Sequence, residues 1–154
     1  MYLENLNNYQ LYVFLQDSGN ELTPIYPVDR GYYNYGFPRG PKFIPPGSQS
    51  FTFVPPAGTE TFFIVASLDR LFDLERLTEE FLKNSESGGQ QEVLIEEIQL
   101  LITDDSQTEA LKNERTRTVE RKTRTESGIV SKSFEATEVH ASKIYARRLD
   151  IDHR

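Results

Sequence analysis

The stretch "FVPPAGTETFFIVAS", from Phe53 to Ser67, constrains the fold more than any other part of the sequence. Each proline disfavours helix at the residue before it, so the chain stays extended until Ala57-Gly58 allows a turn. The run that follows, "TETFFIVAS", is nearly continuous in β-branched and aromatic residues, which is typical of a strand covered on both faces. We therefore expect a rigid corner that sets the register of a central strand.

Other segments predict strands that could pair with this one. Residues 10–15 ("QLYVFL") and 21–27 ("ELTPIYP") flank the turn sequence "DSGN" and predict a hairpin. The second of these strands contains Pro24 and Pro27, which cannot donate ladder hydrogen bonds, so it should lie at a sheet edge or end early. The alternation in "SQSFTFVP" predicts a strand with one buried face. The C-terminal segment predicts a last strand with one alternating face formed by Tyr145, Arg147, Leu149 and Ile151.

The periodicity changes after Ser67. Apolar residues at three- and four-residue spacing predict an amphipathic helix over residues 70–83, with Asp73 or Ser67 as its N-cap. A second apolar stripe predicts another helix over residues 91–102. A strand is the alternative there, because the β-branched content is high.

Two segments lack this regularity. Residues 30–46, "RGYYNYGFPRGPKFIPP", mix glycine and proline with aromatic rings, and we expect a long ordered loop that the rings pin against the body. Residues 104–128 are strongly polar and contain "RTRTVERKTRT". They form either a mobile polar loop or a solvated β-ribbon, and the composition favours the mobile loop.

These elements predict a single domain over residues 1–154. Its fold class is α+β, mainly β. We expect an antiparallel β-sandwich of immunoglobulin-like general shape, with one or two helices inserted after the "FFIVAS" strand.

Charge and composition exclude several classes of protein. The net charge is −7, which disfavours nucleic acid and anionic lipid as partners of the whole molecule. Residues 1–105 carry 6 basic and 16 acidic side chains (−10), whereas residues 106–154 carry 11 basic and 8 acidic ones (+3). The chain has no cysteine, so thiolate chemistry is absent. No apolar run approaches the length of a membrane helix, and "MYLENLNNYQ" lacks the regions of a signal peptide.

The aromatic loop over residues 30–43 is the best candidate for a binding surface. Its rings could stack on sugars or peptide side chains, and Arg30 lies nearby. The alternative is that the rings only cover an open end of the sandwich. The candidate ligand-binding residues are Tyr32, Tyr33, Tyr35, Phe37 and Arg39.

The remaining chemistry is sparse, and we expect no catalytic residue, no cofactor and no metal site. His140 and His153 have no Ser, Cys or metal-ligand constellation at an informative spacing. Asp150 and Asp152 would share one face of a strand and could hold a cation, but a charged terminal strand explains them more simply. The adjacent glutamates of the predicted helices diverge by roughly 100° and cannot converge on one bond.

Three groups of residues resemble a bacterial family of uncharacterised domains, domain of unknown function 4384. They are the hairpin from Gly19 to Pro27, a "Phe-Asp-Leu" at residues 72–74, and the corner residues Pro55, Pro56, Gly58, Thr59 and Glu60. The match covers residues 8–75. The resemblance implies a β-rich accessory domain found beside caspase-like peptidase, kinase or cell-envelope regions. It implies an envelope or extracytoplasmic location and supplies no catalytic residues.

We therefore expect a noncatalytic accessory or protein-interaction module of an envelope-associated or signalling protein, with a protein partner or a neighbouring domain. The competing hypothesis is a glycan- or peptide-binding domain that uses the aromatic loop. An enzyme comes third. Exposed tyrosine rings over a groove would favour ligand binding by the loop, whereas an exposed apolar patch or a paired edge strand would favour an interaction module.

Overall fold

The computed structural model describes residues 1–5, 8–27, 30–35, 40–44, 51–52, 56–84, 88–103, 114–125, 128–140 and 143–153. The described elements follow one another as β1 (Tyr2–Asn5), β2 (Gln10–Gln16), β3 (Leu22–Tyr26), α1 (Tyr32–Tyr35), β4 (Gly40–Phe43), β5 (Gly58–Ser67), α2 (Phe72–Lys83), α3 (Gly88–Thr103), β6 (Arg115–Thr125), β7 (Gly128–Glu138) and β8 (Ile144–His153).

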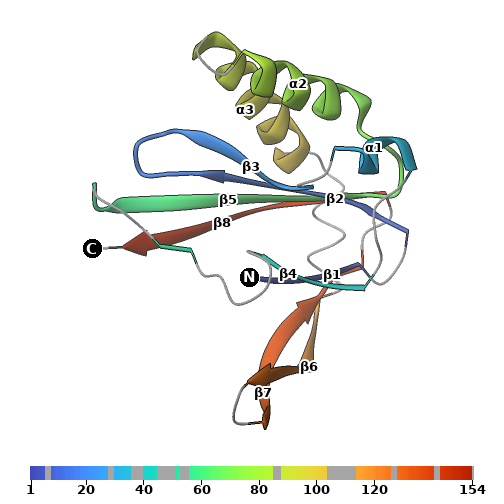
Figure 1. Ribbon diagram of the computed structural model, residues 1–154. Coiled ribbons are helices and arrows are strands. Elements are labelled where there is room, and N and C mark those ends of the chain that lie inside the picture. Colours follow the sequence, from blue (N-terminus) through green and yellow to red (C-terminus); the bar gives the residue numbers. More distant parts are fainter. Residues whose placement is uncertain are drawn as a thin grey trace.

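A four-stranded antiparallel sheet in the order β3-β2-β5-β8 forms the centre of the molecule. Helices α2 and α3 lie side by side on one face, and the short pair β1-β4 lies on the opposite side (Figure 1). The fold is therefore α+β and mainly β, as predicted. The expected two-sheet sandwich is not confirmed, because helices cover one face of the main sheet and only a pair of four-residue strands lies across the other.

Strand β5 is the central element, as its sequence predicts. It pairs with β2 along one edge and with β8 along the other. Phe63 and Val65 contribute to the apolar cluster under the helices, together with Leu74, Leu94 and Ile98. Phe62 and Ile64 belong to a second apolar cluster, on the opposite face of the sheet. This alternation explains why the run has almost no polar residue at its centre.

The corner before β5 is held by the turn between β2 and β3. The Ser18 hydroxyl donates a hydrogen bond of 2.8 Å to the carbonyl of Pro56. A Cβ atom at Gly58 would lie 2.8 Å from the Cβ of Ser18, so glycine is required for this close approach. Pro55 and the residues before it in the corner, 53 and 54, lie outside the described residues.

A buried polar network joins the sheet to the start of α2. The Tyr12 hydroxyl on β2 donates to Oε1 of Glu75 at 2.8 Å, and Arg70 forms an ion pair with the same carboxylate. Because Tyr12 and Glu75 are both buried, each satisfies a polar atom that would otherwise be costly to bury. Burial and this hydrogen bond raise the pKa of Tyr12.

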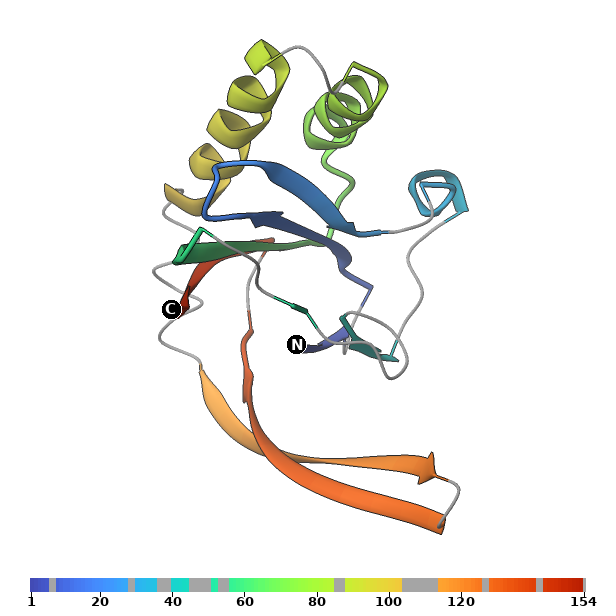
Figure 2. The ribbon, with the colours of Figure 1, turned by 60° about the vertical axis from the view of Figure 1, so that its left-hand side comes forward.

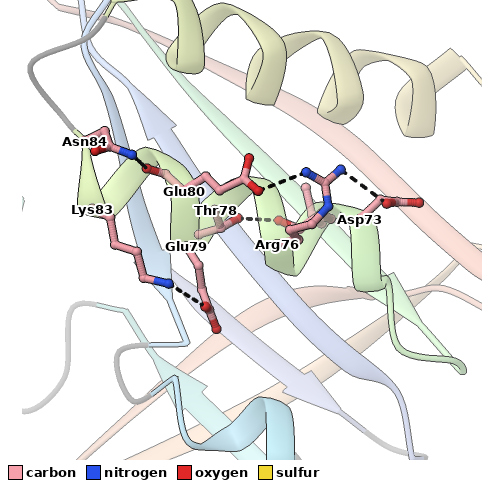
Figure 3. Close-up of polar contacts among 8 residues, drawn as sticks. Asp73, Arg76, Thr78, Glu79, Glu80, Lys83 and Asn84 are labelled. Atoms are coloured by element: carbon pink, nitrogen blue, oxygen red, sulfur yellow. Dashed lines mark hydrogen bonds and ion pairs between the residues drawn. The ribbon is translucent and has the colours of Figure 1, made fainter.

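The two predicted helices are confirmed, but the predicted N-caps are wrong. Leu71 occupies the N-cap position of α2 and makes no side-chain capping bond. Ser67 is the buried last residue of β5, and Asp73 instead lies in the first turn of α2, where it pairs with Arg76. Figure 3 shows the polar contacts along this helix, in which Arg76 also contacts Glu80 and Lys83 contacts Glu79.

The edge position of the second hairpin strand is confirmed by β3, which pairs only with β2 among the described strands. Two other expectations need correction. Of the strand predicted at residues 48–55, only Phe51 and Thr52 lie in the described residues; neither belongs to a strand, and the Phe51 ring packs against Phe62 at 5.2 Å. The segment 30–46 is not simply a loop, because it contains the one-turn helix α1 and the strand β4, which pairs with β1.

The polar segment also differs from the favoured expectation of a mobile loop. Residues 115–125 form β6, which pairs with β7 along its whole length as a long ribbon. Figure 2 shows this ribbon curving away from the body of the molecule. The Thr/Arg alternation thus belongs to a solvated β-ribbon, the alternative interpretation. Residues 104–113 lie outside the described residues.

Replacing Gly58 with alanine should destabilise the fold, because the added methyl group must displace the turn at Ser18. We expect Gly58→Ala to lower the free energy of unfolding by about 1–3 kcal/mol. Gly89→Ala is the control, since nothing lies within 4 Å of its added Cβ in α3 and alanine favours helix, giving up to about 1 kcal/mol of stabilisation. Urea unfolding of both variants measures this, and equal effects would contradict the close approach.

Alkaline pH should weaken the fold through buried tyrosines. Burial, and then the nearby carboxylates, raise the pKa of Tyr33 to about 12, compared with about 10 in the unfolded chain. The neutral phenol is thus favoured in the folded state, so its contribution is complete below about pH 10 and is lost as the pH rises towards 12. The free energy of unfolding should fall less steeply over this interval in Tyr33→Phe than in the wild type. Identical pH profiles would contradict this assignment.

Candidate functional site: a cleft between the sheet and the ribbon

The face of the main sheet opposite the helices is only partly covered, and its open part forms the floor of a cleft of about 550 Å³. Its floor residues come from alternate positions of three neighbouring strands, because alternate side chains of a strand share one face. They are Leu11 on β2, Ile64 and Ala66 on β5, and Tyr145, Arg147 and Leu149 on β8. The floor is therefore mainly apolar, and Leu149 is 41% exposed.

The floor of the cleft is formed by alternate residues of its strands, whereas each wall is formed by consecutive residues. Residues 1–4 line one wall and residues 134–140 line the other, in both cases as consecutive residues. A strand seen face-on contributes every second residue, whereas a strand seen edge-on contributes each residue in turn. The cleft is thus flanked by an edge of β1 and an edge of β7.

Aromatic packing holds the base of the ribbon in place. The Phe134 ring on β7 lies 5.1 Å from the Tyr2 ring and 6.5 Å from the Phe43 ring, so it contacts both β1 and β4. The Arg121 guanidinium on β6 lies 4.0 Å above the Phe43 ring. Such contacts contribute about 0.5–1.5 kcal/mol each beyond the area that they bury. They set the width of the cleft by fixing β7 against β1.

Ion pairs surround the apolar floor. Arg117 of β6 contacts Glu4 of β1 at 3.4 Å, and Arg147 on the floor contacts Glu114 at 3.2 Å. His140 lies 2.9 Å from Glu138. The Tyr2 hydroxyl donates to Glu4 at 2.5 Å, and burial together with this hydrogen bond raises the pKa of Tyr2 to about 12. Each of these pairs is partly exposed, so a bound group could replace one partner.

Of the sequence-predicted binding residues, Tyr32 and Tyr33 lie outside the cleft. Tyr33 is 5% exposed and its ring lies 6.3 Å from that of Tyr12 in the cluster under the helices. Tyr32 is half-buried against Tyr26 on the other side of the sheet. This is the arrangement expected of rings that cover the core. The side chain of Tyr35, and all of Phe37 and Arg39, lie outside the described residues.

The charged residues at the end of β8 contact the neighbouring strand. Asp152 accepts a hydrogen bond of 2.6 Å from Thr59, and Asp150 accepts one of 2.8 Å from Thr61. The hydrogen bonds from Arg148 and then Thr61 lower the pKa of Asp150. His153 lies 3.1 Å from Glu60. In the described ranges, no group of three or more His, Cys, Asp or Glu side chains is placed to hold a metal ion.

No family model, no curated protein and no solved structure matches this chain. The resemblance to the bacterial domain family therefore stays a prediction that depends on the hairpin, the corner residues and the Phe-Asp-Leu at residues 72–74. Of the described helices, none has both the length and the apolar character needed to cross a bilayer.

Sequence reasoning missed the cleft because its parts are ordinary residues that are far apart in the chain. The shared face of Tyr145, Arg147 and Leu149 is predicted by their alternation, and the structure confirms it. The exposure of this face was not predictable, since it depends on how little of the sheet β1 and β4 cover. Phe134, an isolated ring in a polar segment, is the one signal that the ribbon contacts the body.

Truncating Phe134 should release the ribbon from the body. We expect Phe134→Ala to cost about 1–3 kcal/mol locally and to increase hydrogen exchange of the β6 and β7 amides, while β5 amides stay protected. Phe72→Ala is the control, because that ring is 67% exposed on α2. Unchanged exchange in the ribbon of Phe134→Ala would contradict the role of this ring as an anchor.

Proposed function

We propose that this protein is a noncatalytic interaction module that binds an extended segment of a protein partner in the cleft between the sheet and the ribbon. The observation that carries the proposal is the apolar floor, which leaves Leu149 substantially exposed beside Ile64, Ala66 and Tyr145. Exposed apolar surface bordered by polar residues is typical of sites that bind another molecule.

The shape of the cleft supports a peptide over a compact small molecule. Two strand edges border it, and such edges offer backbone donors and acceptors along a line, which suits an extended chain. Arg117, His140 and Arg147 are each paired with a partly exposed glutamate at the cleft, and such polar pairs are common at the rim of an interface. The glycan- or peptide-binding alternative at the aromatic loop has weaker support, because the Tyr33 ring is buried and the Tyr32 ring is half-buried.

The family resemblance suggests a setting for this activity. It implies an accessory domain in a bacterial envelope-associated or signalling protein, in which case the bound segment would belong to a neighbouring domain or to an assembly partner. This setting is part of the proposal and depends on the resemblance alone.

Selection from a library of random linear peptides tests the proposed function. We expect enriched peptides to bind the wild-type protein and to lose at least tenfold in affinity for Leu149→Asp, because a carboxylate would replace an apolar contact on the cleft floor. Binding is measured by isothermal titration. Leu100→Asp is the matched control, since Leu100 is 66% exposed on α3, on the helical side of the sheet.

The comparison of these two variants decides the outcome. Peptides that bind Leu149→Asp as tightly as the wild type use another surface, and a library that yields no binder leaves the cleft without the proposed activity. Either result would overturn the proposal. Circular dichroism of both variants shows whether the exposed substitutions leave the fold intact.

A further inference from the structure

We infer that the partner segment binds as an added β-strand along the open edge of β7, and that it carries net positive charge. This inference rests on the proposed function and specifies how the cleft recognises its ligand. It follows from three features of the described residues: the strand edges at the cleft, the two-stranded ribbon with its exposed outer part, and the charges around the floor.

The edge of β7 is the first feature. Strand β7 pairs with β6 along one side, and no other described strand pairs with it. Residues Phe134–Glu138 line the cleft consecutively, so the unpaired edge of this segment faces the space above the floor. Five residues of strand extend about 17 Å, which offers a pairing length close to that of an average strand.

The second feature is the ribbon itself. A two-stranded ribbon on its own is marginally stable, and stability normally requires a third strand or a packed face. Here Phe134 packs against the body, but Ile129 and Val130 farther along β7 are 73% and 43% exposed. A third strand at β7 would add ladder hydrogen bonds to the ribbon and place its own inward side chains against the apolar floor.

The third feature is the charge balance, which determines the chemistry of the ligand. The charged side chains that line the cleft are Arg117, Arg147, Glu4, Glu135 and Glu138, and the Met1 amino group at the cleft donates a hydrogen bond to the carbonyl of Ile44. With His140 neutral, two arginines against three glutamates give −1, and Arg117 and Arg147 are paired with Glu4 and Glu114. Glu135 is exposed, and no described residue pairs with it. A strand that bears lysine or arginine thus complements the exposed carboxylate of Glu135.

The test uses synthetic peptides that alternate valine with threonine and carry a lysine near each end. A strand pairs with one neighbour through the backbone groups of alternate residues, in parallel and in antiparallel pairing alike. Two N-methylated isomers therefore distinguish strand addition from binding through side chains alone. One isomer is methylated at the odd-numbered amides and the other at the even-numbered amides. We expect one isomer to lose at least tenfold in affinity and the other to bind like the parent peptide. Titrations are followed by isothermal titration and by backbone NMR of the β7 amides.

Charge is tested with a peptide in which glutamate replaces both lysines. The lysine peptide should bind at least tenfold more tightly at low salt, and the difference should shrink as salt is added. Glu135→Lys should reduce this preference. Glu92→Lys, the same change at an exposed glutamate on α3, should leave it unchanged.

The possible results separate this inference from the proposed function. If both methylated isomers bind equally, or if the glutamate peptide binds as well as the lysine peptide, the inference is overturned while a cleft sensitive to Leu149→Asp retains its proposed role. If no alternating peptide shifts the β7 amides at millimolar concentration, strand addition is overturned. If library peptides also ignore Leu149→Asp, the proposed function falls as well.

Discussion

Strand β5 has large apolar side chains on both faces, and both faces must be shielded from water. The two sides are shielded by different means. Helices α2 and α3 provide a continuous layer over Phe63 and Val65, whereas the short strands β1 and β4 cover only part of the face that contains Phe62 and Ile64. The cleft is a direct result of this difference, because its floor is the part of the second face that β1 and β4 do not cover.

The strongly periodic elements were predictable from the sequence because their patterns are local. The run at residues 59–67 predicts a strand buried on both faces, and the spacing of apolar residues predicts both long helices, each within a few positions of its observed ends. Pro24 correctly places β3 at the edge of the sheet, since proline cannot donate to a second neighbour. These elements determine the fold class.

The elements that build the cleft depend on distant pairing, and their sequences carry little local signal. Strands β1 and β4 have four residues each and pair across a gap of more than thirty residues, so no periodicity long enough to detect them exists. The ribbon is polar, and the composition of β6 resembles that of a mobile loop. Continuous pairing between β6 and β7 and the packing of Phe134 nevertheless keep the ribbon ordered. A sandwich was expected because β5 is apolar on both faces, which indicates that a second layer covers it. The sequence does not indicate how small that second layer is.

The residues of the candidate site were also hard to predict from the sequence. Aromatic rings grouped in the sequence, such as Tyr32 and Tyr33, attract attention as binding residues, but they pack into separate clusters on the two sides of the sheet. The cleft instead uses aliphatic residues that look like ordinary core residues, and only their position next to an uncovered strand edge makes them distinctive. Residue type alone therefore could not separate an exposed floor from a buried core.

Strand β8 pairs with β5, although two helices and the whole ribbon lie between these strands in the sequence. Their pairing joins residue 67 to residue 144 and residue 58 to residue 153. During synthesis on the ribosome, the hairpin and β5 are made well before β8, so the edge of β5 that pairs with β8 stays unpaired while residues 68–143 are added. Pairing of such remote segments is slow, because a large loop must close before any ladder bond forms. Until β8 is made, this edge of β5 is open to pairing with other chains.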